Sequence, residues 1–174
     1  MHSIKFGFSQ QIIMAIEIER KFWIKNKNWK VIANAPEGTV IKQGYLNTDK
    51  ERTVRVRIYG AKAFLTIKGK SVGMTRAEFE YEVPVEDAIE LLQLCHQPII
   101  EKKRYKIAQD NVIWEIDEFE GINEGLILAE VELESETQAV HIPNWVGEEV
   151  TGDIRFYNSN LVNNPFTKWT MDKK

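Results

Sequence analysis

The chain has 174 residues, of which 43% are hydrophobic and 10% aromatic, and its formal net charge is −3 at pH 7. This size and composition are typical of one globular domain with a sizeable core, which excludes a largely disordered chain. Basic and acidic residues are interspersed and no run of about 18 apolar residues occurs, so nothing indicates a surface for duplex nucleic acid or a membrane-spanning helix.

The first 15 residues, MHSIKFGFSQQIIMA, precede the first patterned segment. They lack the compact apolar run and the cleavage site of a signal peptide. We therefore expect an N-terminal extension over 1–15, or translation that begins at Met14, followed by a single domain over 16–174. The one cysteine, Cys95, excludes an internal disulfide and fits a reducing compartment, so we expect a cytoplasmic protein.

Apolar and polar residues alternate in eight segments, which is the pattern of strands with two different faces. Turn-forming residues separate several of them, at Gly60, at Asp110–Asn111 and between Gly121 and Gly125. Such short links predict antiparallel pairing between neighbouring strands. The predicted strands span residues 16–23, 40–47, 52–59, 62–69, 76–84, 99–108, 111–119 and 126–134.

Three segments have the pattern of helices. EDAIELLQLCHQ (86–97) follows Pro84 and places apolar residues at helical spacing, SETQAVHIP (135–143) starts at a serine suited to an N-cap, and TGDIRFYNSNLV (151–162) lies near the end of the chain. The predicted fold class is therefore α+β, with helices around a large antiparallel sheet.

Charged residues gather on one face of the predicted strands, and most strands carry two charges of the same sign on that face. A solvent-facing surface would mix polar and charged residues of both signs, whereas like charges repel unless opposite charges lie among them. The face comprises eight acids (Glu17, Glu19, Glu78, Glu80, Glu115, Asp117, Glu130, Glu132) and six bases (Lys21, Arg55, Arg57, Lys68, Lys102, Arg104).

A closed barrel of eight antiparallel strands would direct these charges into one interior, and such a barrel can hold a small ligand. The apolar faces would then point outward, where helices could cover them. Carboxylates suit hard divalent cations such as Mg²⁺, while arginine and lysine suit phosphate oxygens. The interior is therefore expected to bind divalent cations together with a chain of phosphates.

The segment Glu17-Ile18-Glu19-Arg20-Lys21 resembles the Glu-x-Glu-x-Lys signature of the CYTH superfamily, the triphosphate tunnel metalloenzymes. The resemblance covers about residues 16–165. It continues through QGYL (43–46), VRVR (54–57), LTIKG (65–69), RAEFEYEV (76–83), IEKKRY (100–105), WEID (114–117), LAEVEL (128–133) and GEEVTGDIRFYN (147–158).

The resemblance implies a closed eight-stranded antiparallel tunnel with peripheral helices and a C-terminal plug helix, in an enzyme that uses Mg²⁺ or Mn²⁺. It implies that Thr151–Leu161 forms the plug, with Arg155 near the substrate, although Ile154 and Phe156 depart from the residues that the family often has there. The implied substrate ligands are Lys21, Arg55, Arg57, Lys68, Lys102, Arg104 and Arg155. The implied metal ligands are Glu17, Glu19, Glu130 and Glu132, with Glu78, Glu80 and Asp117 completing the metal and water shell.

The expected activity is metal-dependent hydrolysis of a terminal phosphoanhydride, with inorganic tripolyphosphate as the first candidate substrate and Lys21, Glu19 and Lys102 as catalytic residues. The general base stays open between a tunnel carboxylate and a lysine with a lowered pKa, such as Lys21 or Lys102. The alternatives are thiamine triphosphate hydrolysis, cyclisation of ATP by a class IV adenylyl cyclase, and a non-catalytic sensor of polyphosphate or nucleotides.

The expected partner is a small molecule that contains a triphosphate, with no nucleic acid or membrane. Outward apolar faces that exceed what three helices cover would favour a homodimer. KGKSVG (68–73) resembles the end of a phosphate-binding P-loop, but that motif requires glycine at position 64, where the chain has Phe64. The histidines, His2, His96 and His141, lack partners at the spacing of a zinc site.

Overall fold

The computed structural model describes residues 18–24, 26–32, 34–49, 51–72, 75–135 and 137–170. The expected extension over residues 1–15 and the predicted metal ligand Glu17 lie outside these residues. Among the helices in the described ranges, none has the length and apolar character needed to cross a membrane.

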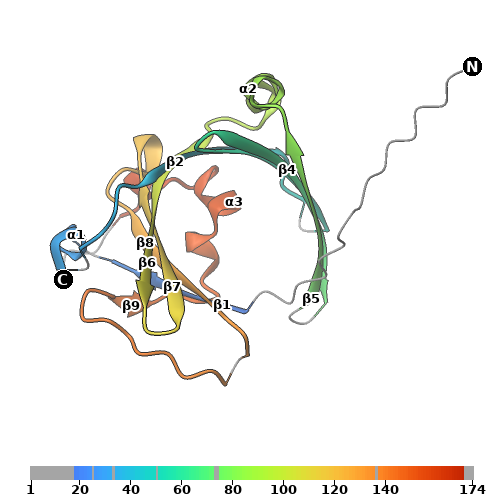
Figure 1. Cartoon of the computed structure of the whole chain (residues 1–174). Coiled ribbons are helices and arrows are strands. Elements are labelled where there is room, and N and C mark those ends of the chain that lie inside the picture. The colour runs from blue at the N-terminus through green and yellow to red at the C-terminus, as the bar shows by residue number, and fades with distance from the viewer. Residues whose placement is uncertain are drawn as a thin grey trace, which may run out of the picture.

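The described chain forms one antiparallel sheet that curves around α3 (Asn158–Leu161), as Figure 1 shows. The strand order is β5-β4-β3-β2-β6-β7-β8-β1-β9. The strands are β1 (Ile18–Trp23), β2 (Thr39–Asn47), β3 (Arg52–Tyr59), β4 (Lys62–Val72), β5 (Thr75–Val83), β6 (Ile100–Gln109), β7 (Val112–Phe119), β8 (Ile127–Leu133) and β9 (Glu148–Glu149). The eight predicted strands are confirmed within a few residues at their ends, and the short β9 was not predicted.

The predicted closure of the sheet into a barrel is wrong. In the described structure β5 is one edge of the sheet and β9 the other, and Figure 1 shows the gap between β5 and β1. The edge of β1 that faces away from β8 already has partners. Phe22 and Trp23 pair with β9, and the carbonyl of Lys21 accepts a hydrogen bond from the amide of Val150 at 2.8 Å. Because these backbone groups are satisfied, that part of β1 has no free positions for β5.

One of the three predicted helices is confirmed. α2 (Val85–Leu94) starts directly after Pro84 and lies outside the curved sheet (Figure 1). Its buried residues Ala88 and Leu92 pack in one cluster with Val56 and Ala63 of β3 and β4. The outward apolar face of these strands is thus covered by a helix, as expected.

Gly44 in β2 permits the end of α2 to approach the sheet closely. A Cβ atom at this position would lie 2.7 Å from the Cβ of Cys95, which is too close for any larger residue without a shift. Cys95 is a buried free thiol directly after the helix.

The predicted helix over 135–143 is wrong, because the described residues of that segment contain no helix. Val140 and Ile142 instead pack against the outer face of β1, β6, β7 and β8, in the same cluster as Trp114 and Val131. Their spacing of two residues suits an extended segment better than a helix. α1 (Trp29–Ile32), which was not predicted, covers the same face through the fully buried Trp29.

The predicted helix over 151–162 is divided in two. A 3-10 turn, η2 (Ile154–Phe156), begins where Asp153 accepts a hydrogen bond from the amide of Arg155 at 3.0 Å. Tyr157 then has an extended backbone, and α3 follows. Two further 3-10 turns are η1 (Gly121–Asn123) and η3 (Phe166–Lys168).

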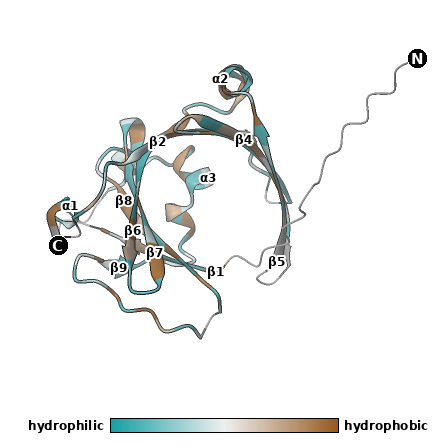
Figure 2. Cartoon of the chain, viewed as in Figure 1, coloured by the Kyte–Doolittle hydropathy of each residue, from teal (hydrophilic) through white to brown (hydrophobic). Residues whose placement is uncertain are grey.

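The C-terminal segment fills one end of the space inside the sheet. Phe156, Leu161 and Val162 pack there with strand residues that face inward, such as Ile100 and Leu128. The ring centroids of Trp23 and Phe156 lie 5.9 Å apart. Figure 2 shows hydrophobic and hydrophilic residues along the same ribbons, as expected for strands with two different faces. The inner face is therefore apolar at this end.

Candidate active site

A cavity of about 510 Å³ lies on the concave side of the sheet, above the apolar end. Residues 157–159 of the C-terminal segment contribute Tyr157, Asn158 and Ser159 to its wall. Its charged lining consists of seven bases (Lys21, Arg55, Arg57, Lys68, Lys102, Arg104, Lys106) and six acids (Glu19, Glu78, Glu80, Glu115, Glu130, Glu132). A cavity of this size can hold a small ligand, and its lining requires a charged one.

These side chains lie on the concave face because successive residues of a strand point to opposite faces of the sheet. In β3, Arg55 and Arg57 line the cavity while Val56 between them is fully buried on the outer face. In β6, exposure of the side chains rises along the inner face, from Lys102 at 2% to Arg104 at 13% and Lys106 at 52%. Because the apolar residue Ile100 precedes them and is itself buried, the cavity opens in the direction of Lys106.

One group of ion pairs joins β3, β4 and β5. The carboxylate of Glu80 accepts hydrogen bonds from Arg55 at 3.3 Å and from Arg57 at 3.2 Å, and from the hydroxyl of Thr66 at 2.7 Å. Lys68 forms an ion pair with Glu78 at 2.7 Å. The Nε atoms of Arg55 and Arg57 are buried and have no hydrogen-bond partner in the described structure. Because buried donors normally have a partner, these two unsatisfied donors indicate a ligand that would engage them.

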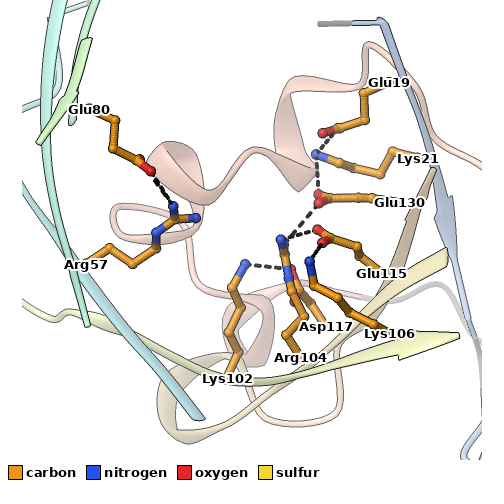
Figure 3. Close-up of polar contacts among 10 residues, drawn as sticks. All are labelled: Glu19, Lys21, Arg57, Glu80, Lys102, Arg104, Lys106, Glu115, Asp117 and Glu130. Carbon is orange, nitrogen blue, oxygen red and sulfur yellow. Dashed lines mark hydrogen bonds and ion pairs between the residues drawn. The ribbon is translucent and has the colours of Figure 1, made fainter. Parts of the chain in front are cut away.

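A second group joins β1, β6, β7 and β8 across the cavity, and Figure 3 shows the two groups facing each other. Arg104 binds Asp117 at 2.7 Å, Glu130 at 3.2 Å and also Glu115. Lys106 pairs with Glu115 at 2.7 Å. The charges of this wall are thus already paired with one another.

Lys21 lies between two carboxylates, with its ammonium 3.1 Å from Glu19 and 2.9 Å from Glu130. In the register of β1 and β8, Glu19 is opposite Glu132 and Lys21 is opposite Glu130. No three carboxylate, histidine or cysteine side chains converge on a metal site within the described ranges. The carboxylate oxygens of Glu19 and Glu130 nevertheless suit a hard divalent cation, because they already hold the positively charged ammonium of Lys21 between them.

Burial and charge shift the pKa values of this wall in opposite directions. Burial alone would lower the pKa of Lys21, but the charges of Glu130 and Glu19 outweigh it and hold the pKa above its usual range. For Lys102 burial dominates and lowers the pKa, against the opposing charge of Asp117. Burial would raise the pKa of Asp117, but Lys102 and Arg104 hold it below its usual range. Lys21 therefore remains a cation at neutral pH.

The structure brings together most of the residues predicted for the site. Lys21, Arg55, Arg57, Lys68, Lys102, Arg104, Glu19, Glu78, Glu80, Glu130 and Glu132 all line the cavity. Asp117 does not line it, because its carboxylate lies beneath Lys102 and Arg104 and is only 1% exposed. Arg155 does not line it either, because its guanidinium is mostly exposed and pairs with Asp153 at 2.6 Å.

Lys106 is a lining residue that the sequence analysis missed. It shares the inner face of β6 with Lys102 and Arg104, so continuing the alternation by two residues would have found it. Tyr157, Asn158 and Ser159 were placed in a plug helix, but nothing in their pattern indicated which of them face the cavity.

The CYTH domain model matches residues 15–158 of the chain. A protein of Acetivibrio thermocellus named inorganic triphosphatase is 49% identical over 154 residues, which is 88% of this chain and 97% of that protein. A protein of Nitrosomonas europaea with the same name is 36% identical over 153 residues, with 83% of this chain and 95% of that protein covered.

Solved structures also match this chain. A crystal structure of an inorganic triphosphatase superimposes with a TM-score of 0.63 and 32% identity, covering 86% of this chain and 95% of the other. A putative adenylate cyclase from Bacillus halodurans has a TM-score of 0.56 at 17% identity, covering 69% and 81%. The second similarity concerns the fold alone.

Proposed function

The chain belongs to the CYTH domain family, and from this membership we propose that it hydrolyses inorganic tripolyphosphate with the help of a divalent cation. Two relatives named inorganic triphosphatase support this substrate. The cavity supports it independently, because a ligand there must satisfy both bases and carboxylates.

The observation that carries the proposal is the pair of arginines on β3. Arg55 and Arg57 line the cavity, and the buried Nε atom of each has no hydrogen-bond partner in the described structure. Arginine is the side chain best suited to phosphate oxygens, because its planar donors match their geometry. A phosphate chain would satisfy these donors and replace the carboxylate of Glu80 between the two guanidinium groups.

The proposed triphosphate ligands are Lys21, Arg55, Arg57, Lys68, Lys102 and Arg104, to which the structure adds Lys106 as a candidate. Their shared role is to neutralise the phosphate oxygens and to hold the terminal phosphorus in line with an attacking water. Arg155 is left out of this set, because it pairs with Asp153 outside the cavity.

The proposed ligands of Mg²⁺ or Mn²⁺ are Glu19, Glu130 and Glu132 on β1 and β8, with Glu78 and Glu80 on β5. Glu17 stays a proposed ligand from the sequence, and it lies outside the described residues. When bound to these carboxylates, the cation would offset the negative charge of the phosphate chain.

In the proposed reaction a water molecule attacks the terminal phosphorus, the bond from that phosphorus to the bridging oxygen breaks, and pyrophosphate leaves beside inorganic phosphate. The bases stabilise the negative charge that gathers on the leaving oxygen. Lys21 and Lys102 would contact the phosphates directly, and Glu19 would hold Lys21 in place or, with a cation bound, ligate that cation. A cavity carboxylate, or Lys102 in its neutral form, would accept the proton of the water.

Phosphate release from tripolyphosphate, ATP and thiamine triphosphate tests this function, with Mg²⁺ or Mn²⁺ added and a parallel assay for cyclic AMP. We expect the highest kcat/KM with tripolyphosphate and no turnover when EDTA removes the cation. Higher kcat/KM with a nucleotide or with thiamine triphosphate would contradict the choice of substrate. Tight binding of tripolyphosphate without turnover would identify a sensor instead of an enzyme.

A further inference from the structure

Asp117 is the most deeply buried carboxylate beside the cavity. It belongs to β7, its side chain is 1% exposed, and it is absent from the cavity lining. Lys102 and Arg104, which do line the cavity, lie between it and the ligand space. Figure 3 shows Asp117 behind Arg104, with a dashed line that joins it to Lys102.

Both oxygens of Asp117 are engaged by these bases. Its Oδ2 accepts hydrogen bonds from Lys102 Nζ at 2.5 Å and from Arg104 at 2.7 Å, while its Oδ1 accepts one from Arg104 Nε at 2.7 Å. Arg104 and Asp117 are direct partners in the register of β6 and β7. A two-point contact between arginine and carboxylate fixes the plane of the guanidinium as well as its position.

Lys102 depends on this contact more than Arg104 does. The Lys102 side chain is 2% exposed, and a buried ammonium requires a nearby anion to remain charged. Arg104 has two further carboxylates, Glu115 and Glu130, within ion-pair distance. Loss of the Asp117 charge would therefore disturb the deepest base of the cavity first.

We propose that Asp117 is a positioning residue that fixes Lys102 and Arg104 for the phosphate chain, and that it does not ligate the divalent cation. This inference rests on the proposed function, since it assigns a role within the same site. A metal ligand would have to present an oxygen to the cavity, as the lining carboxylates Glu130 and Glu132 can. Asp117 directs its oxygens to the bases instead.

The test compares Asp117→Asn with Glu130→Gln in three measurements. Asp117→Asn should raise the KM for tripolyphosphate about 10- to 100-fold, with a smaller change in kcat, because a hydrogen bond to a charged group is lost on each base. Calorimetric binding of tripolyphosphate in EDTA should weaken by a similar factor. The dissociation constant for Mn²⁺ alone should change less than about threefold, whereas Glu130→Gln should weaken it more than tenfold.

Glu118→Gln is the matched control, because Glu118 is the next residue of β7 and its ion pairs with Lys27 and Lys30 lie on the outer face. It should leave the KM for tripolyphosphate unchanged. If Asp117→Asn does not fold, Asp117→Glu keeps the charge and should still raise the KM while leaving Mn²⁺ binding unchanged.

Two results would overturn the inference. Mn²⁺ binding that weakens as much in Asp117→Asn as in Glu130→Gln would make Asp117 a metal ligand. Unchanged tripolyphosphate binding in a folded variant would mean that the bases do not depend on Asp117. The two binding measurements need no turnover, so they decide the inference even if wild-type protein releases no phosphate and the proposed function fails.

Discussion

Lys21 illustrates how single residues of this cavity are arranged for a ligand that carries both signs of charge. Its ammonium is held by Glu19 and Glu130. The same ammonium lies 5.7 Å from the centroid of the Tyr157 ring, which links Lys21 to the C-terminal segment. The charges of the wall neutralise one another, which lowers the cost of burying them. A phosphate chain with its cation can exchange these partners while keeping each charge paired.

Replacement of Lys21 by alanine should reduce turnover of tripolyphosphate about 100-fold or more, because a cation placed against the charge of the transition state is lost. Arg20→Ala is the matched control. Arg20 is the neighbouring residue, but it pairs with Glu149 outside the cavity at 2.6 Å. Phosphate-release kinetics should show near-normal activity for Arg20→Ala, and near-normal activity for a folded Lys21→Ala variant would refute the assignment.

At the level of whole elements, β7 carries two consecutive carboxylates, Asp117 and Glu118, on opposite faces of the sheet. Asp117 holds the bases of the cavity, while Glu118 holds the segment that contains α1 on the outer face. Glu118 binds Lys27 at 2.7 Å, and it also binds Lys30 and the hydroxyl of Tyr105. Trp29 of α1 packs on the ring of Tyr105, with centroids 4.9 Å apart. Glu118 therefore anchors α1 to the sheet.

This anchor should make stability depend on pH. Burial alone would raise the pKa of Glu118, but hydrogen bonds from Lys27 and Lys30 outweigh it and lower the pKa from 4.5 to about 2. A carboxyl with a lowered pKa stabilises the folded state above its unfolded pKa, and this contribution disappears as the pH falls through the folded pKa. The stabilisation should therefore be complete above pH 4.5 and lost towards pH 2.

Glu118→Gln should lower the free energy of unfolding by about 1 to 3 kcal/mol at neutral pH. The difference from wild type should shrink as the pH falls from 4.5 to about 2. Urea unfolding of both proteins across this pH range measures it. A difference that stays constant with pH would show that the Glu118 charge is not its cause.

On the scale of the whole molecule, the sheet wraps around its ligand space without closing, as Figure 1 shows, and the C-terminal segment fills one end with apolar side chains. Helices and loops cover much of the outer apolar face. A ligand in the cavity would contact side chains from strands on opposite sides of the curve. Binding should therefore stabilise the entire fold and not one element alone.

Mn²⁺ alone, at about 100 times its dissociation constant, should stabilise the folded state by about 2.7 kcal/mol, which for a chain of this length raises Tm by about 5 to 10 °C. Differential scanning fluorimetry measures the shift. Glu130→Gln, which removes a proposed cation ligand, should show a smaller one. An equal shift in both proteins would mean that Glu130 takes no part in binding.

The sequence by itself determined the strands and the face on which each charge lies, because alternation is a local property of extended backbone. The alternation therefore predicted that Glu19, Lys102 and Glu130 lie on one face of the sheet, and the family resemblance supplied the substrate class. Only the tertiary structure decided that Asp117 lies under the bases, that Arg155 turns away and that the sheet stays open. The burial of Asp117 and the open sheet depend on competition between distant groups, such as residues 148–150 bonding the edge of β1, and no local pattern encodes such competition.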